Sequence, residues 1–230
     1  MFYRLLVSFI QITLALGFIS QPIHTSLVPV TGTSLDTTSG STPASMPTLP
    51  EFIRAVSNNT SAPAGIYVSN TLAFPIVQQP SDNPGFVSTK ENVVTNFAFA
   101  SQYKSTGLLA HNYLAGAQFP AINNGQHLAL VLGNGSVVYY KVTAIRSYQA
   151  LQPYSPYSNF IDLADTTRKL SATDLFMETY GIADRLVLQT CIDAEGIDSW
   201  GRLFIIAEPD PTYRPTSPKT LTSREHLITM

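Results

Sequence analysis

Short apolar runs separated by turn residues fill the chain from about residue 65 to residue 208. Runs of this length, rich in β-branched and aliphatic residues, are typical of β-strands. They are Ile66–Val68, Leu72–Val77, Leu108–Ala110, His127–Leu132, Ser136–Ile145, Arg185–Thr190 and Arg202–Ala207. Many short strands with few helices predict an all-β fold, either a barrel or a sandwich.

Local signals mark one hairpin and two short helices. Gly133–Gly135 lies between two apolar runs and predicts a tight hairpin turn. Ser171, followed three residues later by Asp174, forms a capping-box pattern, so we expect a helix from there to Gly181. Glu51–Ser57 is a second candidate, because its apolar residues share one helical face.

Composition excludes several classes of protein. The 230 residues carry a net charge of −2 and only 12% charged side chains, against a usual share of about 25%. Without a basic cluster, we do not expect nucleic acid as a partner. Cys191 is the single cysteine, which excludes an intrachain disulfide and a Cys-rich zinc site.

The N-terminal residues indicate export. Arg4 precedes the apolar stretch Leu5–Ile19, which is shorter than the ~20 residues of a membrane-spanning helix. Residues 1–19 therefore predict a secretory signal peptide or an uncleaved signal-anchor, with an ordinary buried helix as the alternative. We expect an extracytoplasmic protein, either secreted or anchored to the membrane through this segment.

A polar segment follows the signal. Residues 20–50 include 18 Ser, Thr or Pro among 31 residues and one charge, Asp36. Such a segment has too little apolar area to offset its ordering entropy, so it predicts a flexible stalk. The expected organisation is thus signal or anchor, stalk, a β-barrel domain over residues 51–210, and a polar tail over residues 211–230.

Three reactive residue types each stand at the end of a predicted strand. Cys191 follows the run Arg185–Thr190, and Arg202 begins the next run after a predicted loop, Ile192–Gly201. If these strands pair antiparallel, the thiol and the guanidinium lie at the same end of the sheet. A thiol at a strand end can reach solvent, a nearby cation lowers its pKa, and Arg can hold an oxyanion. The ordinary alternatives are a small buried cysteine and an arginine that faces water.

Two histidines are candidates for a partner of the thiol. His111 ends the run that begins at Thr106, so its ring can lie over a cleft and exchange protons with Cys191. His127 instead opens a run and is followed by the apolar residues Leu128–Leu132. We therefore expect His111 to act with Cys191 and His127 to be structural.

These segments resemble the sortases, the cysteine transpeptidases of bacterial surfaces. The family signature is Thr-Leu-x-Thr-Cys; Leu188–Cys191 fit it, and Val187 replaces the first Thr. The matching segments are Leu108–Tyr113, the hairpin from Gly125 through Val142, Val187–Cys191 and Trp200–Phe204. In this order and spacing they cover roughly residues 65–208.

The resemblance implies a closed barrel of about eight strands and a site made of three residues. Cys191 would be the nucleophile, His111 the acid and base, and Arg202 the group that binds substrate and oxyanion. Sortases cleave a sorting signal such as Leu-Pro-x-Thr-Gly, form a thioacyl enzyme and transfer the acyl group to an amine. The implied partners are proteins with a C-terminal sorting signal and an amine acceptor, either a cell-wall precursor or a protein Lys.

Departures from the family leave alternatives open. The connection Tyr148–Asp184 is long, so it assigns no sortase subclass and no sorting motif. No cofactor is expected; calcium, which some sortases bind, has candidate ligands in Asp162, Asp165, Asp174 and Glu178, with solvated acids as the alternative. The alternative function is an inactive sortase-fold binding module on the cell surface. An L,D-transpeptidase is disfavoured, because its Ser-His-Gly-Cys run is absent.

Overall fold

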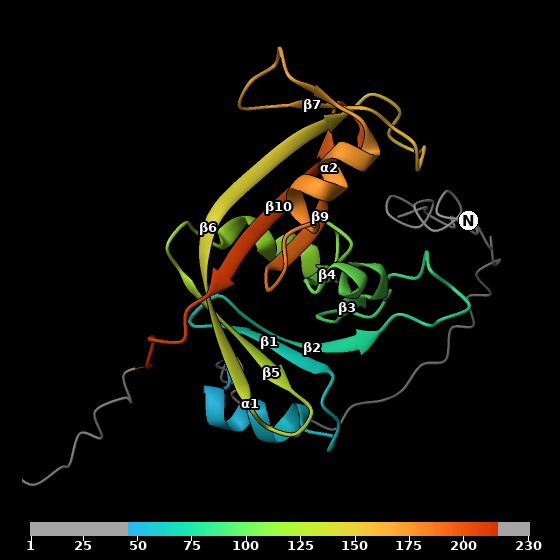
Figure 1. Cartoon of the computed structure of the whole chain (residues 1–230). Helices are drawn as coiled ribbons and strands as arrows, with labels where there is room; N and C mark the ends of the chain where they lie inside the picture. The colour runs from blue at the N-terminus through green and yellow to red at the C-terminus, as the bar shows by residue number, and fades with distance from the viewer. Residues whose placement is uncertain (1–45, 216–230) are drawn as a thin grey trace, which may run out of the picture.

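Residues 46–215, which the computed structural model describes, form a β-barrel with two short α-helices (Figure 1). The predicted signal, most of the stalk and the end of the tail lie outside the described residues. The strands are β1 (Pro63–Val68), β2 (Leu72–Gln78), β3 (Val94–Phe97), β4 (Thr106–Leu109), β5 (His127–Leu132), β6 (Val137–Ala150), β7 (Phe160–Asp162), β8 (Lys169–Leu170), β9 (Leu186–Ala194) and β10 (Ile197–Pro209). The helices are α1 (Leu49–Val56) and α2 (Ala172–Thr179), with 3₁₀ turns η3 (Ala98–Tyr103) and η4 (Ala115–Ala121).

Strand pairing closes the barrel. The sheet runs in the order β10-β9-β4-β3-β2-β1-β5-β6-β7-β8, and β10 also pairs with β6. The eight strands from β10 to β6 therefore form a ring, while β7 and β8 extend the sheet beyond it. This arrangement confirms the expected closed all-β barrel of about eight strands.

The inside of the ring is an aliphatic core. Side chains of a strand alternate between faces, and on β9 the residues Leu186 and Leu188 belong to the inner cluster. The same cluster takes residues from all eight strands, including Ile66, Phe74, Leu108, Leu130, Val142 and Ile205. Burial of each such side chain stabilises the fold by about 1.5–3 kcal/mol.

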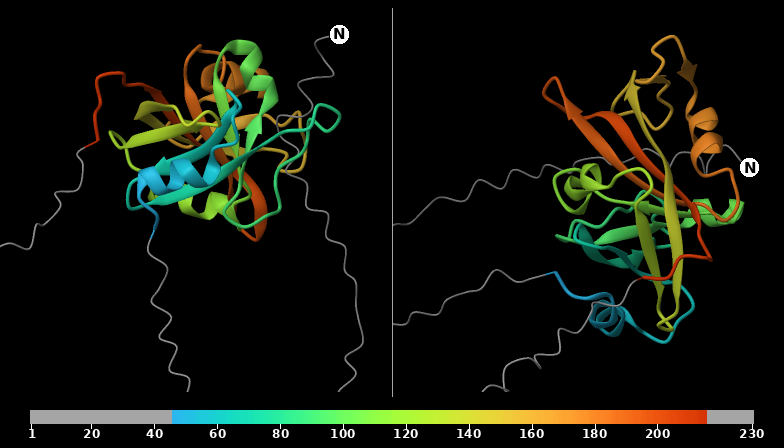
Figure 2. Two further views of the ribbon diagram at one scale, coloured as in Figure 1. Left: turned by 90° about the horizontal axis from the view of Figure 1, so that it is seen from below. Right: turned by 90° about the vertical axis from the view of Figure 1, so that its left-hand side faces the viewer.

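A second core covers part of the outer surface of the barrel. Helix α2 lies outside the ring (Figure 2, right), and its Phe176 and Tyr180 pack with Phe97 and Phe204 in one buried cluster. Ring pairs join this cluster, among them Phe99 and Phe176 with centroids 5.1 Å apart. The outward faces of β4, β9 and β10 are consequently buried as well.

The local helix signals are confirmed, with one shifted boundary. The side chain of Ser171 accepts a hydrogen bond from the Asp174 amide at 3.1 Å and caps α2. Helix α1 begins at Leu49, so the last two residues of the predicted stalk belong to it. Among residues 46–215, no helix is long and apolar enough to cross a membrane.

The segment between Cys191 and Arg202 differs from the sequence prediction. Residues 192–201 contain three acids and two glycines and were expected to form a loop. Instead β9 continues to Ala194 and β10 begins at Ile197, with Glu195 and Gly196 at positive φ in a tight turn. The ladder is interrupted between Ile197 and Gly201, so the polar residues of this hairpin occupy an irregular stretch of strand.

Candidate active site

Three adjacent strands bring the three predicted site residues together. Arg202 on β10 is the direct antiparallel partner of Cys191 on β9. Strand β4 pairs with β9 in parallel, with Leu109 opposite Gln189. Continuing that register by two residues places His111 level with Cys191. The side chains of His111, Cys191 and Arg202 thus form a row across β4, β9 and β10.

The row lies on the outward face of the barrel. Cys191 belongs with Val187 to the outer cluster, and so do Leu109 and Phe204, each two residues from a member of the row. Because alternate residues share a face, His111 and Arg202 also project outward.

Burial of the row corrects the expectation that the thiol reaches solvent. Cys191 is 4% exposed, His111 6% and Arg202 1%. Cys191 also lies three residues before the end of β9, and Arg202 lies inside β10. Both strands extend beyond these residues, and the outward face is buried. The sequence pattern therefore placed Cys191 and Arg202 wrongly at exposed strand ends.

Burial also reverses the expected shift of the thiol. Removal from water raises the pKa of Cys191 above its ordinary value of 9.0, and nearby Arg202 lowers it by less, while Asp198 raises it. Desolvation disfavours the charged form. The thiol is therefore protonated at neutral pH in this closed conformation.

His111 is buried with an unused ring nitrogen. Burial lowers the pKa of its imidazole, and an interaction with the Val87 backbone raises it by less. Because this interaction favours the protonated ring, the group involved is the Val87 carbonyl oxygen. Nδ1 has no hydrogen-bond partner among the described residues. The ring of Tyr113 stacks on the imidazole, with centroids 5.2 Å apart.

The guanidinium of Arg202 is fixed by main-chain carbonyls. Nη1 donates to the oxygens of Ser199 and Gly201, each at 2.8 Å, and Nη2 donates to that of Pro153 at 3.1 Å. Nε is buried and has no acceptor within residues 46–215. Burial lowers the pKa of Arg202, and Cys191 opposes this shift. The alternative of an arginine that faces water is thus wrong.

Backbone contacts hold the three strands in register at the row. The Ala110 amide donates to the Gln189 carbonyl at 3.1 Å, and the Thr190 hydroxyl donates to the Ala110 carbonyl at 2.9 Å. Asn112 Nδ2 donates to the Asp198 carbonyl at 3.0 Å, which ties the chain after His111 to the hairpin. Asn112 and Thr190 both lie in segments that resemble sortases, Leu108–Tyr113 and Val187–Cys191.

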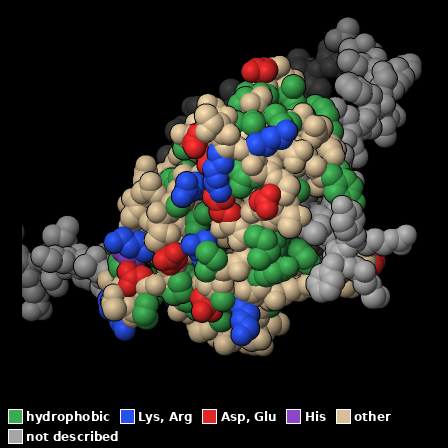
Figure 3. Space-filling view, turned by 45° about the horizontal axis from the view of Figure 1, so that its top comes forward, with side chains coloured by type: hydrophobic (Ala, Val, Ile, Leu, Met, Phe, Trp, Pro, Cys, Tyr) green, Lys and Arg blue, Asp and Glu red, His purple; other side chains and the backbone are tan. Residues whose placement is uncertain are grey.

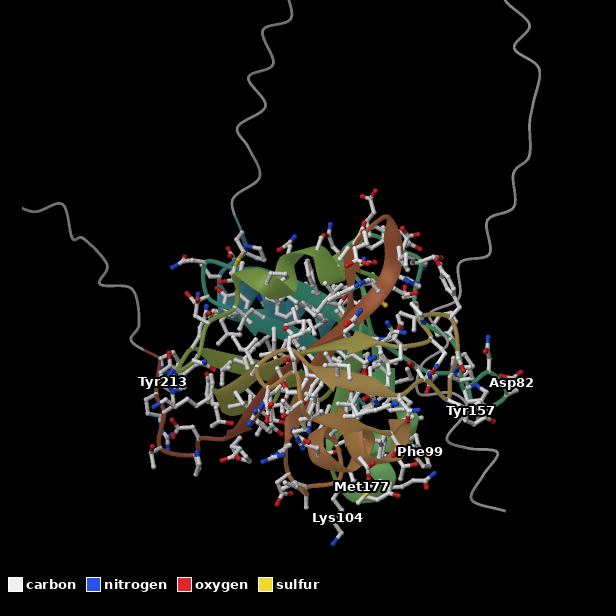
Figure 4. The ribbon with its side chains drawn as sticks, turned by 90° about the horizontal axis from the view of Figure 1, so that it is seen from above. Asp82, Phe99, Lys104, Tyr157, Met177 and Tyr213 are labelled. Atoms are coloured by element: carbon white, nitrogen blue, oxygen red, sulfur yellow. The ribbon has the colours of Figure 1, made fainter. Side chains whose placement is uncertain are left out.

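His127 lies in a separate cluster. Its Nε2 is 3.0 Å from Asp210 Oδ2, and its ring stacks on Tyr213 with centroids 3.7 Å apart. Figure 4 places Tyr213 on the opposite side of the molecule from Tyr157, which follows shortly after Pro153. This cluster attaches the start of the C-terminal tail to the barrel.

The four acids considered for calcium make other contacts. Arg168 forms ion pairs with Asp162 at 3.1 Å and with Glu178, Asp165 accepts from Thr167, and Asp174 caps α2. No group of three or more His, Cys, Asp or Glu residues able to hold a metal occurs in the described part of the chain. Asp162 is buried and Glu178 half-buried, so neither is a fully solvated acid, whereas Asp165 and Asp174 are exposed.

Charges of both signs are mixed on the visible surface. In Figure 3, basic and acidic side chains lie close together over the face shown, separated by polar and apolar patches. No stripe of one sign crosses this face. The mixture is in keeping with the small net charge and gives no support to a nucleic-acid interface.

Comparison with known proteins matches this chain to sortase structures. No family model matches it, and no curated protein matches it in sequence. A sortase C1 of Streptococcus agalactiae is 14% identical with a TM-score of 0.44, over 70% of this chain and 76% of that one. A Listeria monocytogenes sortase A is 10% identical with a TM-score of 0.40, over 66% and 88%. A Clostridium perfringens sortase C, solved with the C-terminal cell wall sorting motif, is 17% identical with a TM-score of 0.42, over 70% and 83%. Each of these three structures is of a sortase, the family that the sequence motifs resemble.

Proposed function

We propose that this protein is a sortase-like cysteine transpeptidase. The observation that carries the proposal is the row formed by Cys191 on β9, Arg202 directly opposite it on β10, and His111 two residues beyond the end of β4. A nucleophile, a proton carrier and a fixed cation within one row are the groups that acyl transfer requires. The resemblance of Leu188–Cys191 to the sortase signature supports the same assignment.

The first half of the reaction forms a thioester. The Cys191 sulfur, its proton taken by His111, attacks the carbonyl carbon of the scissile peptide bond. Arg202 Nε, which has no acceptor in the described chain, donates to the oxyanion. When the intermediate collapses, the C–N bond breaks and His111 gives its proton to the leaving amine. The acyl group is then bound to Cys191 as a thioester.

The second half transfers the acyl group. An incoming amine attacks the thioester carbonyl, its proton passes to His111, and the thiolate of Cys191 leaves and is reprotonated. The proposed substrates are proteins with a C-terminal sorting signal, and the acceptor is an amine of a cell-wall precursor or of a protein Lys. We propose an extracytoplasmic location, because both substrates are met there.

The alternative is a sortase-fold module that binds without catalysis. Burial of all three side chains and the raised pKa of the Cys191 thiol favour it, because a resting nucleophile usually has a lowered pKa. The two functions make different predictions for the same peptide.

Mass spectrometry of the full chain after incubation with sorting peptides tests the proposal. We expect an acyl adduct on Cys191 in the wild type and in His127→Ala, and none in His111→Ala. His127 is a matched control, since it is the other histidine of the barrel and lies outside the row. Binding of the peptide without any adduct would favour the inactive module, and an adduct lost in His127→Ala but kept in His111→Ala would overturn the site.

A further inference from the structure

His111 lies beyond the part of β4 that strand pairing fixes. The last residue pair of the β4–β9 ladder is Leu109 with Gln189, and the Ala110 amide adds one more bond to the Gln189 carbonyl at 3.1 Å. Pairing therefore stops before His111. A group that exchanges protons with Cys191 must nevertheless be held at a defined distance from it, so other contacts have to fix the imidazole.

The main chain of His111 is fixed within its own turn. Its carbonyl accepts from the amides of Leu114 at 3.0 Å and Gly116 at 2.9 Å. A β-carbon at Gly116 would collide with the Thr190 hydroxyl, so this turn packs closely on β9. These contacts hold the turn together and place it against β9, and they leave its position relative to β10 to another contact.

Asn112 supplies that contact. Its Nδ2 donates to the Asp198 carbonyl at 3.0 Å, and its side chain is half-buried. Asp198 belongs to β10, and β9 lies between β10 and β4 in the sheet. The hydrogen bond therefore joins the two neighbours of β9 just beyond Cys191.

The interrupted ladder explains why the Asp198 carbonyl is available. Strand β9 pairs with β10 at Ile197 and again from Gly201 onward, and β6 pairs with β10 from Gly201 onward. Between these pairs, residues 198–200 have no ladder partner in the described chain. Their carbonyls can therefore accept hydrogen bonds from side chains.

The next carbonyl of this irregular stretch serves Arg202. The Ser199 carbonyl accepts from Arg202 Nη1 at 2.8 Å. Ser199 is itself buried, and its hydroxyl donates at 3.3 Å to the Pro153 carbonyl, which also accepts from Arg202 Nη2. Two consecutive residues of β10 thus contact both the segment that carries His111 and the guanidinium of Arg202.

We propose that Asn112 is a positioning residue for the proposed transpeptidase. Its hydrogen bond to the Asp198 carbonyl fixes His111 against the same stretch of β10 that fixes Arg202. The proton carrier and the cation thereby keep a constant separation on the two sides of Cys191. Asn112 acts through His111 and takes no proton itself. Its role rests on the proposed function for its purpose, but its hold on His111 can be measured without any peptide.

The pKa of the His111 imidazole, followed by NMR titration of the full chain, measures this hold. Burial lowers this pKa from its ordinary value of 6.5, so an imidazole that gains contact with water should titrate at a higher pH. Asn112→Leu keeps the branched shape without the N–H donor, and Asn112→Ala shortens the side chain. Both variants should raise the pKa of His111 toward 6.5. His111→Ala assigns the resonance.

The substitutions leave the charged and titratable groups near the imidazole unaltered. These groups are Cys191, Arg202 and Asp198 at the row, and Tyr113, whose ring stacks on the imidazole. Neither Leu nor Ala adds a charge. A raised pKa of His111 therefore reports greater hydration of its ring.

Asn123 is the matched control. Its Nδ2 also donates to a main-chain carbonyl, that of Ala121 at 3.1 Å, but within its own turn. Asn123→Ala should leave the pKa of His111 close to that of the wild type, and thermal unfolding shows whether the barrel of each variant is intact. An unchanged pKa of His111 in both Asn112 variants, or an equal shift in Asn123→Ala, would overturn the positioning role.

Single-turnover acylation, with the sorting peptide that modifies the wild type, measures the effect on the reaction. Misplacing a proton carrier slows the chemical step more than it weakens binding. We expect both Asn112 variants to lower the maximal rate roughly ten- to a hundredfold, with a half-saturating peptide concentration close to that of the wild type. A change in the half-saturating concentration alone would contradict positioning of His111 and indicate a contact with the peptide.

The two measurements separate this inference from the proposed function. If the wild type forms no acyl adduct while the Asn112 variants raise the pKa of His111, the transpeptidase proposal fails and the hold of Asn112 on His111 stands. If the wild type forms the adduct and the Asn112 variants acylate at the wild-type rate, the positioning role fails and the transpeptidase stands.

Discussion

The two faces of β4, β9 and β10 are both buried, and they are built from different residues. The inner face carries aliphatic side chains such as Leu108, Leu188 and Ile205. The outer face of the same strands carries the thiol and the guanidinium, with the imidazole beside them, and all three side chains are buried. Two of the four buried side-chain nitrogens without partners in the described chain, His111 Nδ1 and Arg202 Nε, belong to this outer row.

The difference separates stability from chemistry within one set of strands. An apolar inner face is stabilised by burial alone, with no polar group to satisfy. The outer row instead buries polar groups and leaves two nitrogens unmatched, which is unfavourable for folding. We infer that the outer row is kept for its chemistry. Substitutions on the outer face should therefore affect acylation most, and substitutions on the inner face should affect the free energy of unfolding most.

Replacing the thiol should have the largest effect on chemistry. Cys191→Ala removes one sulfur from the outer cluster, so the fold should persist, while acyl-adduct formation should be lost completely. Mass spectrometry and the thermal unfolding midpoint measure the two effects. Peptide cleavage at the wild-type rate by this variant would show that the row is not the reaction centre.

Arg202→Lys should lower the rate of acylation by about 10²–10³, the usual effect of losing one oxyanion donor. Lys keeps the charge, but it lacks the planar guanidinium of Arg202. That group donates to three main-chain carbonyls and has its Nε available for the oxyanion. The same lost hydrogen bonds should lower the free energy of unfolding by about 1–3 kcal/mol. Single-turnover kinetics and urea unfolding give the two values, and unchanged kinetics would limit Arg202 to a structural role.

Leu188→Ala tests the inner face at a position three residues from the nucleophile. The cavity it leaves should lower the free energy of unfolding by about 2–5 kcal/mol. Acylation per folded molecule should change little, because the side chain points away from the row. Urea unfolding measures the stability, and a fall in activity without a fall in stability would mean that the two faces are coupled.

The pH dependence of alkylation tests the neutral state of the thiol. Burial raises the pKa of Cys191 above 9.0, so the reactive thiolate should keep increasing with pH beyond that value. The rate at which iodoacetamide alkylates the folded protein should have its midpoint above pH 9.0, whereas the midpoint for the unfolded chain should lie near the ordinary thiol value of 9.0. A plateau of the folded protein near neutral pH would indicate a thiolate already present in the covered state.

The smallest effect is expected at the tail cluster. Hydrogen bonds from Thr212 and then His127 lower the pKa of Asp210 to about 2 from 3.8. A lowered carboxyl pKa contributes stability that is full above 3.8 and is lost as the pH falls toward 2. The thermal unfolding midpoint of Asp210→Asn should therefore fall less between pH 3.8 and pH 2 than the midpoint of the wild type. Asp82→Asn, at an exposed position in the connection between β2 and β3, is the control and should follow the wild type.

The sequence predicted the barrel and the members of the row because both leave local traces. Alternating apolar runs marked seven of the strands, and Gly133–Gly135 marked the hairpin, where Gly135 has a φ of 84°. Strand β3 (Val94–Phe97), the three-residue strand β7 and the two-residue strand β8 are too short for a periodic pattern, so the sequence did not predict them. Their places depend on pairing with distant segments.

The environment of the row could not be predicted in the same way. Whether Cys191 reaches solvent depends on the other members of the outer cluster, such as Val87 and Phe97, which are distant from it in sequence. The sign of its pKa shift follows from that burial and not from the presence of Arg202. Residue type identified the candidate site residues, whereas their burial and protonation depend on the tertiary structure.

The closing strand of the barrel is also the last strand in the described part of the chain. During synthesis β10 emerges after the other strands of the barrel, and until then β9 and β6 keep free edges that can pair with other chains. The guanidinium of Arg202 arrives on this same strand. Cys191 and Arg202 therefore lie side by side only after β10 has closed the barrel. Before that step, the chain exposes the open edges of β9 and β6 and lacks a complete row.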